Sequence, residues 1–108
     1  MADQPRTNIN DIRIREMAAL ACAPAIIHNL LDVNIVRVMG SFGTRATFTS
    51  RYINGCLAAT NLHTEMEYVE KHVERLLDMN VIWQPDDRYK YYKLTHDMVQ
   101  LIREIQNP

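Results

Sequence analysis

The chain has 108 residues, enough for one domain with a modest core. Hydrophobic residues make up 47% of it and charged residues 23%, which is typical of a globular protein and excludes a disordered chain. The net charge of −1 gives no overall attraction for nucleic acid. No apolar run approaches the roughly 20 residues that cross a membrane, and the polar N-terminus has no signal pattern, so we expect a cytoplasmic protein with no membrane partner.

The N-terminal part of the chain divides into a polar segment and a helical pattern. Residues 1–7 contain few apolar side chains and are expected to be disordered, while residues 8–108 are expected to form a single domain. A first helix is predicted to begin near Asn8 or Asn10, either of which can cap it, and to extend through Ala21.

Pro24 interrupts this pattern. It can open a second helix as its first residue, followed by the run AIIHNLLDVNIVRVMG with apolar residues at helical spacing. The residue before a proline disfavours a helical conformation, but the pattern leaves one kinked helix and two separate helices both open. Gly40 and Gly43 then favour the end of the helix and a tight loop.

A short strand and a third helix are predicted next. Ala46 to Phe48 are β-prone and consistent with one small edge strand. Thr49 or Ser50 then caps a helix that extends to about Ala59.

The run from Thr64 predicts a fourth helix. Thr64 and Glu67 have the spacing of a capping box, in which each side chain satisfies a free backbone donor of the other residue. Asn80 can adopt the left-handed conformation that ends the helix. On the solvated side, Glu70 and Glu74 are expected to pair with Lys71 and Arg75. The apolar spacing predicts a buried face formed by Met66, Val69, Val73, Leu76 and Leu77.

A hairpin and a last helix complete the pattern. VIWQ and RYKYYKL flank the turn sequence PDD, which predicts two paired strands. Alternation places Tyr92 and Leu94 towards the core and Tyr89 and Tyr91 on the other face. Thr95 is predicted to cap a helix whose inner face is formed by Met98, Leu101, Ile102 and Ile105.

The sequence shows no catalytic pattern. We find no Ser/His/Asp arrangement, paired catalytic carboxylates or Gly-rich phosphate loop, so we expect no enzyme activity and no cofactor. Cys22 and Cys56 have no ligand at metal-binding spacing and are expected to be buried free thiols, with a redox-sensing thiol as the alternative. No metal site is expected, although a composite metal or pH-sensing site remains open for the scattered histidines His28, His63, His72 and His96.

The run FTSRYINGCLAATNLHTEMEYVEKHVERLLDMNVIWQPDDRYKYYKLT resembles the winged helix-turn-helix of small prokaryotic transcription regulators, of the arsenical-repressor and multiple-antibiotic-resistance type. VEKHVERLLDMNVI stands at the place of their recognition helix and following strand, and YYKLT at the place of their closing strand. The resemblance covers about residues 30–106. It implies a mainly α fold with a small β-hairpin, a helix-turn-helix at about 49–79, a wing at about 81–94, and an extra N-terminal helix and C-terminal helix.

The resemblance also implies a DNA-binding surface. The start of the recognition helix would face the major groove with His63, Thr64, Tyr68, Lys71, His72 and Arg75, of which the last four point outward by helix geometry. This chain departs from the family in the first turn, where Glu65 and Glu67 replace the usual Ser, Thr, Gln or Arg. The departure favours a helix that is positioned on DNA over one that reads bases.

Phosphate contacts are expected from other segments. No Asp or Glu occurs from Val33 to Thr64. Within this acid-free stretch, the segment GTRATFTSR offers Arg45, Thr47, Thr49, Ser50 and Arg51 to phosphates. The wing offers Arg88, Lys90 and Lys93 to phosphates. The simpler interpretation is that these side chains only keep an exposed hairpin solvated.

We therefore expect a homodimer that binds duplex DNA through the recognition helix and wing, most simply a transcription regulator; a plasmid- or virus-type DNA-organising protein is a close variant. The N-terminal and last helices would form the dimer contact, because residues 8–22 carry more apolar surface than a minimal winged core needs. The rival interpretation is a winged-helix protein-interaction module, in which the acidic helix suits a basic partner. A single-strand or RNA binder that stacks bases on the tyrosines ranks lower.

Overall fold

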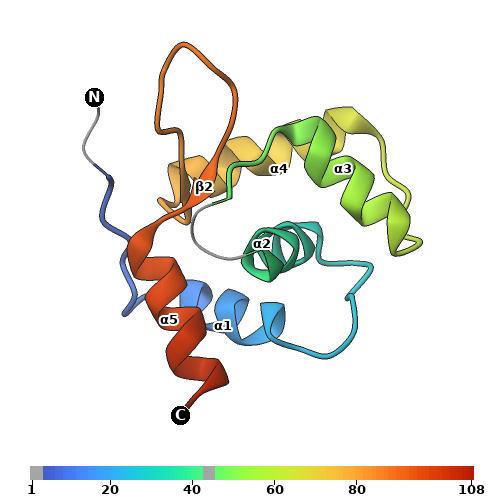
Figure 1. Ribbon diagram of the computed structural model, residues 1–108. Helices are drawn as coiled ribbons and strands as arrows, with labels where there is room; N and C mark the ends of the chain where they lie inside the picture. The colour runs from blue at the N-terminus through green and yellow to red at the C-terminus, as the bar shows by residue number, and fades with distance from the viewer. Residues whose placement is uncertain (1–3, 43–45) are drawn as a thin grey trace.

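The computed structural model describes residues 4–42 and 46–108. These residues form five α-helices and one two-stranded antiparallel sheet, which confirms the predicted mainly α fold with a small β-hairpin (Figure 1). No helix among them is long and apolar enough to span a bilayer. In chain order the elements are α1 (Ile12–Ala21), α2 (Leu31–Ser41), α3 (Ser50–Ala59), α4 (Met66–Asp78), β1 (Ile82–Trp83), β2 (Lys93–Leu94) and α5 (His96–Gln106).

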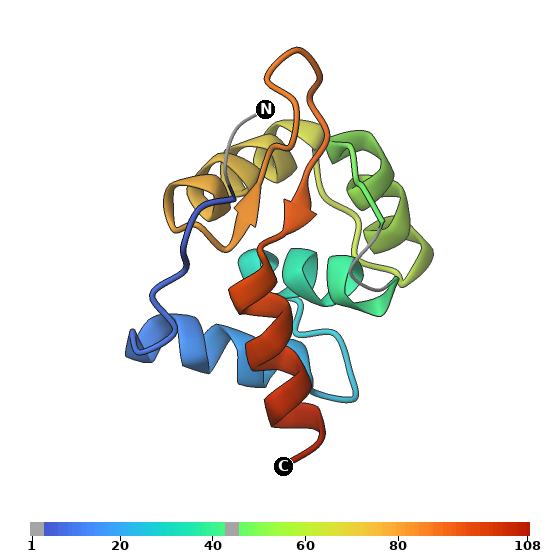
Figure 2. The same cartoon turned by 60° about the vertical axis from the view of Figure 1, so that its left-hand side comes forward.

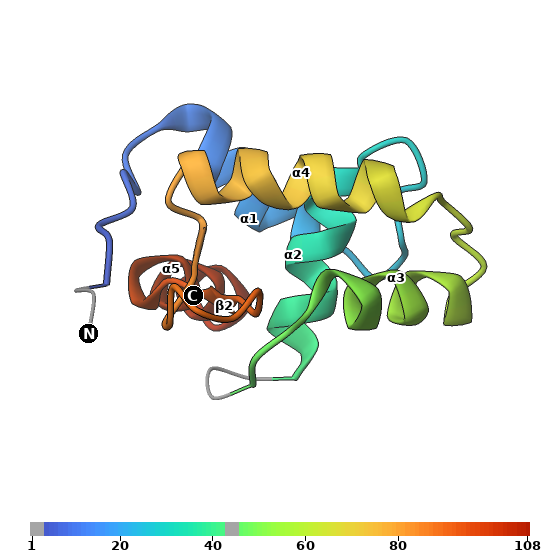
Figure 3. The same cartoon turned by 90° about the horizontal axis from the view of Figure 1, so that it is seen from above.

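Helix α2 forms the centre of the fold. It contacts α1, α3, α4 and β2, while α1 also packs on α5, and α3 packs on α4. Figure 2 shows α1 and α5 together at the lower end of the molecule, with the hairpin at the opposite end. Viewed from above, α4 and α3 lie on different sides of α2 (Figure 3).

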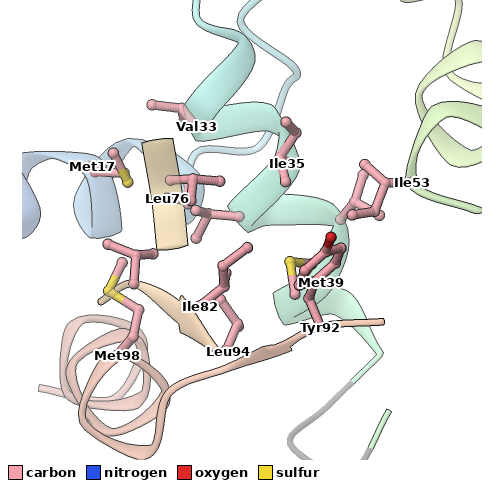
Figure 4. Packing of buried hydrophobic residues seen from close by; sticks show 14 of the residues in the cluster. Met17, Val33, Ile35, Met39, Ile53, Leu76, Ile82, Tyr92, Leu94 and Met98 are labelled. Carbon is pink, nitrogen blue, oxygen red and sulfur yellow. The ribbon is translucent and has the colours of Figure 1, made fainter. Parts of the chain in front are cut away.

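The core lies where these elements meet. Figure 4 shows Met39 of α2 next to Ile82 and Leu94 of the sheet, with Met98 of α5 near Met17 of α1. Met39, Ile82 and Met98 have no measurable exposure. Burial of such side chains is the main force that holds the layers together, at roughly 1.5–3 kcal/mol for each fully buried aliphatic side chain.

Helix α1 begins one residue later than predicted. Its N-cap is Asp11, whose carboxylate accepts a hydrogen bond from the Arg13 amide at 2.8 Å. Asn8 instead accepts from the Asn10 amide at 3.3 Å, in the turn that precedes the helix. The carboxylate at Asp11 is therefore the group that satisfies the free donors of the first turn.

Helix α2 begins at Leu31, so the prediction that Pro24 opens it is wrong. The cause is Asn34, which is fully buried although it is polar. Its side-chain amide donates to the Ile27 carbonyl at 2.5 Å, and its side-chain oxygen accepts from the Ile27 amide at 3.0 Å. A buried amide satisfied in this way fixes the backbone at Ile27 as a loop. Helices α1 and α2 are accordingly two separate helices.

The hairpin pairs Ile82 with Leu94 and Trp83 with Lys93. The predicted edge strand at Ala46–Phe48 is reduced to a bridge between Phe48 and Tyr92, whose backbone groups exchange two hydrogen bonds of 2.8 Å. Tyr92 and Leu94 are buried, as predicted from the alternation. The bridge joins the segment before α3 to the second arm of the hairpin.

The segment at residues 4–7, which the composition predicted to be disordered, is bound to the start of α5. The buried Thr7 hydroxyl contacts the Asn80 carbonyl and lies 2.6 Å from the Thr95 hydroxyl. The Thr7 amide donates to Asp97 at 3.2 Å, and Gln4 accepts from the His96 amide. Polar pairing, which a count of apolar residues does not detect, therefore orders this segment.

Candidate nucleic-acid interface

Helices α3 and α4 form a pair joined by a short turn. Thr49 caps α3, as predicted, and its hydroxyl accepts from the Tyr52 amide at 3.1 Å. Asn61 adopts a left-handed conformation with φ 68°, and the buried Leu62 donates its amide to the Leu57 carbonyl. The turn therefore closes tightly against the end of α3, which fixes where α4 begins.

The predicted capping box at the start of α4 is absent. The N-cap is Glu65, and its side chain makes no capping hydrogen bond. Thr64 stands one residue before the cap, so its hydroxyl lacks the required register. Glu67 pairs instead with Lys71, Oε1 to Nζ at 3.5 Å.

The inner face and the end of α4 agree with the prediction. Val69, Val73 and Leu76 are buried, while Met66 and Leu77 are partly buried. Asn80 ends the helix with φ 58°. The position of the outer face is thereby fixed.

The outer face of α4 is predominantly acidic. Glu65, Glu67, Glu70, Glu74 and Asp78 are all exposed. Tyr68 is 51% exposed, and its ring lies 5.8 Å from the Lys71 ammonium. The predicted pairing of Glu70 and Glu74 with Lys71 and Arg75 is not observed; Glu67 and Asp32 are the partners of these two cations.

Asp32, in the first turn of α2, binds two of the predicted DNA-contacting residues. His72 Nδ1 makes a short contact with one carboxylate oxygen, and Arg75 Nη2 lies 3.5 Å from the other. The side chains of Asp32 and His72 are only 18% and 26% exposed. His72 therefore faces α2 and not solvent, contrary to the prediction, while Arg75 stays 64% exposed but has an acidic neighbour.

The arginine of the hairpin loop is also paired. Arg88 holds Asp86 through two parallel contacts, Nη2 to Oδ2 at 2.9 Å and Nε to Oδ1 at 3.1 Å. These hydrogen bonds keep the pKa of Asp86 below its usual value. The Arg88 guanidinium also lies 5.5 Å from the Tyr89 ring, which stacks on Tyr91. Lys90 is exposed and makes no ion pair with any described residue.

Two carboxylates of α4 act on Tyr92 of the hairpin. The pKa of Tyr92 is raised, first by burial and then by the carboxylates of Glu70 and Glu74. These two side chains therefore act on the hairpin and on any phosphate that approaches between the two elements. Such a phosphate would be repelled at short range.

The start of α3 has the opposite character. Arg51 is exposed in the first turn and has no ion-pair partner among the described residues. Thr47 is exposed and Ser50 partly buried, next to Thr49 at the helix N-terminus. The predicted contact at Arg45 lies outside the described residues. The free amides of this first turn and the Arg51 guanidinium suit an anion.

Most of the apolar side chains at residues 8–22, which were expected to form a dimer contact, are buried within the same chain. Ile14, Met17, Ala18 and Ala21 of α1 are buried, in a helix that packs on α2 and α5. Ile12, by contrast, is 80% exposed. The sequence argument for a dimer surface on α1 now depends on this one side chain and its neighbour Ile9, which is 38% exposed.

The two cysteines are partly buried and free. Burial raises the pKa of Cys22, against a smaller opposing effect of Arg37, so its thiol stays protonated at neutral pH. This protonation disfavours the redox-sensing alternative for Cys22. Among the described residues no group of three His, Cys, Asp or Glu side chains could hold a metal ion.

Sequence reasoning missed Asp32. It precedes His72 by 40 positions, and its only local signal is its place as the last acid before the acid-free stretch. A partner so distant in the chain becomes visible only once α2 and α4 are packed together.

No known protein family, curated protein sequence or solved structure matches this chain.

Proposed function

We propose that this chain is a winged helix-turn-helix protein that binds duplex DNA, mainly through the phosphates, and that it acts as a transcription regulator. The order of α2, the Phe48 bridge, α3, α4 and the hairpin agrees with the winged arrangement suggested by the sequence. Function depends on the side chains that a fold presents at its surface.

The observation that carries the proposal is the bridge between Phe48 and Tyr92. Phe48 stands two residues before the first residue of α3, and Tyr92 belongs to the hairpin. The bridge therefore brings the unpaired Arg51 and the N-terminus of α3 close to the hairpin, which has the unpaired Lys90. A DNA backbone could then contact both elements at once.

Contacts to phosphates are favoured over base reading because the cations of α4 are paired with acidic side chains. Lys71 has Glu67 as its neighbour, and Arg75 has Asp32. About half to two-thirds of protein–DNA hydrogen bonds go to the backbone, and they require Arg, Lys, hydroxyls and helix N-termini. The start of α3 has all of these except lysine. We therefore propose weak discrimination between DNA sequences.

The dimer is a second part of the proposal. Two copies would double the footprint of a small module on DNA. Ile12 and Ile9, at the exposed start of α1, would form the contact. Sedimentation should show a dimer that Ile12→Arg converts to a monomer, whereas an unmodified chain that sediments as a monomer at micromolar concentration would contradict this part.

One observation favours a second candidate. The four exposed acids of α4, with Glu65 at its N-cap, outnumber its two exposed cations, each of which already has an acidic partner. Such a surface suits a basic protein partner, as in winged helices that serve as interaction modules. We rank this candidate second because the start of α3 has no acid.

A salt titration tests the leading proposal. Fluorescence anisotropy with a labelled random duplex should show an affinity that falls linearly with salt on logarithmic axes, because each phosphate contact releases counterions. Absence of binding at about 50 mM salt would contradict the proposal, since phosphate contacts are strong there. An oligolysine peptide in a parallel titration tests the second candidate, which requires the peptide to bind while the duplex does not.

A further inference from the structure

An apolar groove lies between the C-terminal half of α2 and one face of α3. Its volume is about 260 Å³. Val38 and Phe42 form one wall and Cys56 and Ala59 the other, and Ile26 of the loop before α2 closes one end. The groove shares α3 with the proposed DNA surface, but its lining residues on α3 are Cys56 and Ala59 in the C-terminal half, whereas Ser50 and Arg51 of the DNA surface lie in the first turn.

Two exposed aromatic side chains extend the groove. Phe42 is 54% exposed and Tyr52 is 50% exposed, and their rings meet edge to face at 5.9 Å. Each also contacts the buried Phe48 at 5.8 Å. Adjacent exposed aromatic rings next to an apolar groove are typical of interaction sites, whereas a single exposed apolar side chain is ordinary.

The α3 side of the groove is shaped for close approach. Tyr52, Cys56 and Ala59 follow the spacing of one helix face. Gly55 lies next to them, and a Cβ placed there would meet no atom within 4 Å. A glycine inside a helix costs about 0.5–1 kcal/mol relative to alanine. No neighbour within the described chain requires a glycine at this position, which leaves the helix surface beside the groove open.

The charge around the groove selects the occupant. No acid occurs from Val33 to Thr64, which includes both walls, and Arg37 lines the groove. An acidic segment would therefore approach without repulsion. A helix suits the dimensions, because side chains three or four residues apart form an apolar edge that fits between two helices.

We propose that this groove binds an acidic amphipathic helix of a partner protein. The apolar face of that helix lies against Phe42, Cys56 and Ala59, and its carboxylates lie near Arg37. The proposal does not require DNA binding, since the groove and the DNA surface use different residues of α3.

Two designed peptides of about 15 residues, long enough for marginal helicity, serve as the probe. Both have leucines on one face; the other face has glutamates in the first peptide and lysines in the second. By fluorescence anisotropy the glutamate peptide should bind at least about tenfold tighter, which corresponds to about 1.4 kcal/mol. Equal affinities, or a preference for the lysine peptide, would overturn the proposal.

Ala59→Arg fills the groove, and Ala19→Arg on α1 is its matched control, because both are exposed helical alanines. Ala59→Arg should lower the affinity for the glutamate peptide about tenfold, while Ala19→Arg should change that affinity by less than about twofold. Equal affinities of the two variants would overturn the proposal.

A second pair of variants guards against unfolding of Ala59→Arg, which thermal denaturation would detect. Phe42→Ala should lower the affinity for the glutamate peptide. Tyr68→Ala removes an equally exposed aromatic ring from α4 and should leave that affinity unchanged. If the protein is a homodimer and Ala59→Arg or Phe42→Ala dissociates it, the groove holds a second copy of this chain. That result would overturn the choice of a partner helix as the occupant.

Discussion

The one cation of α3 and three cations of α4 and the hairpin loop lie in different electrostatic surroundings. Arg51, at the start of α3, has no ion-pair partner among the residues that the structure describes, and the sequence around it has no acid. Lys71, Arg75 and Arg88 each lie within 3.5 Å of a carboxylate of the same chain. The four cations would look equivalent in a count of basic residues. Their ability to attract a phosphate differs, because a paired cation contributes little field at a distance.

The largest expected effect comes from removing the unpaired cation of α3, Arg51. Arg51→Ala should lower duplex affinity about fivefold to tenfold and reduce the slope of the salt dependence by about 1, as expected for one lost phosphate contact. Lys71→Ala should lower affinity by only about twofold, since Glu67 already offsets its charge. Anisotropy titrations at several salt concentrations measure both values. A larger effect at Lys71 would reverse the comparison.

The next effect comes from releasing the cation on α4. Asp32→Asn removes the acidic partner of Arg75 and should raise duplex affinity about threefold. It should also lower the free energy of unfolding by about 1–2 kcal/mol, because His72 loses a charge-assisted hydrogen bond. Asp78→Asn, at the exposed end of α4, removes the same charge without a partner and is the control. Equal gains in affinity would mean that only net charge matters.

A smaller effect is expected in the gap between α4 and the hairpin. Replacing Glu70 and Glu74 by glutamine should raise duplex affinity by about twofold and move the pKa of Tyr92 towards its usual value. The matched control replaces Glu16 and Glu104, two exposed acids on α1 and α5. An ultraviolet titration of the tyrosines measures the pKa, which should not respond to the control.

The smallest effect is on alkaline stability. Because the pKa of Tyr92 is raised in the folded protein, its contribution to stability is complete below the unfolded value of about 10 and decreases as the pH rises above it. Tyr92→Phe should flatten the fall in melting temperature between about pH 9.5 and 11. A melting curve of the same steepness in both proteins would contradict this assignment.

Local patterns predicted much of the fold. The buried face of α4, the cap at Thr49 and the left-handed end at Asn80 each depend on residues within one or two turns of each other. The alternation in the hairpin likewise placed Tyr92 and Leu94 in the core. Signals of this range are fully present in the sequence.

The errors arose where polar side chains act over longer distances. Asn34 organises the loop at Ile27, and Asp32 turns His72 inward, and neither role has a periodic signal. The capping box failed because Thr64 is one residue out of register. The charge pattern of the sequence indicated the acid-free region, but not which cations would be paired elsewhere, since that depends on how α2 meets α4.

The attachment of residues 4–7 has a consequence for the order of folding. The hydrogen bonds of Thr7 and Gln4 join positions 73 to 92 residues apart. Closing so long a loop has a high entropic cost, so these bonds are expected to form after the helical core has assembled. In pulse-labelling during refolding, the Thr7 amide should gain protection later than the amides of α4. The N-terminal segment would then be the last part of the chain to become ordered.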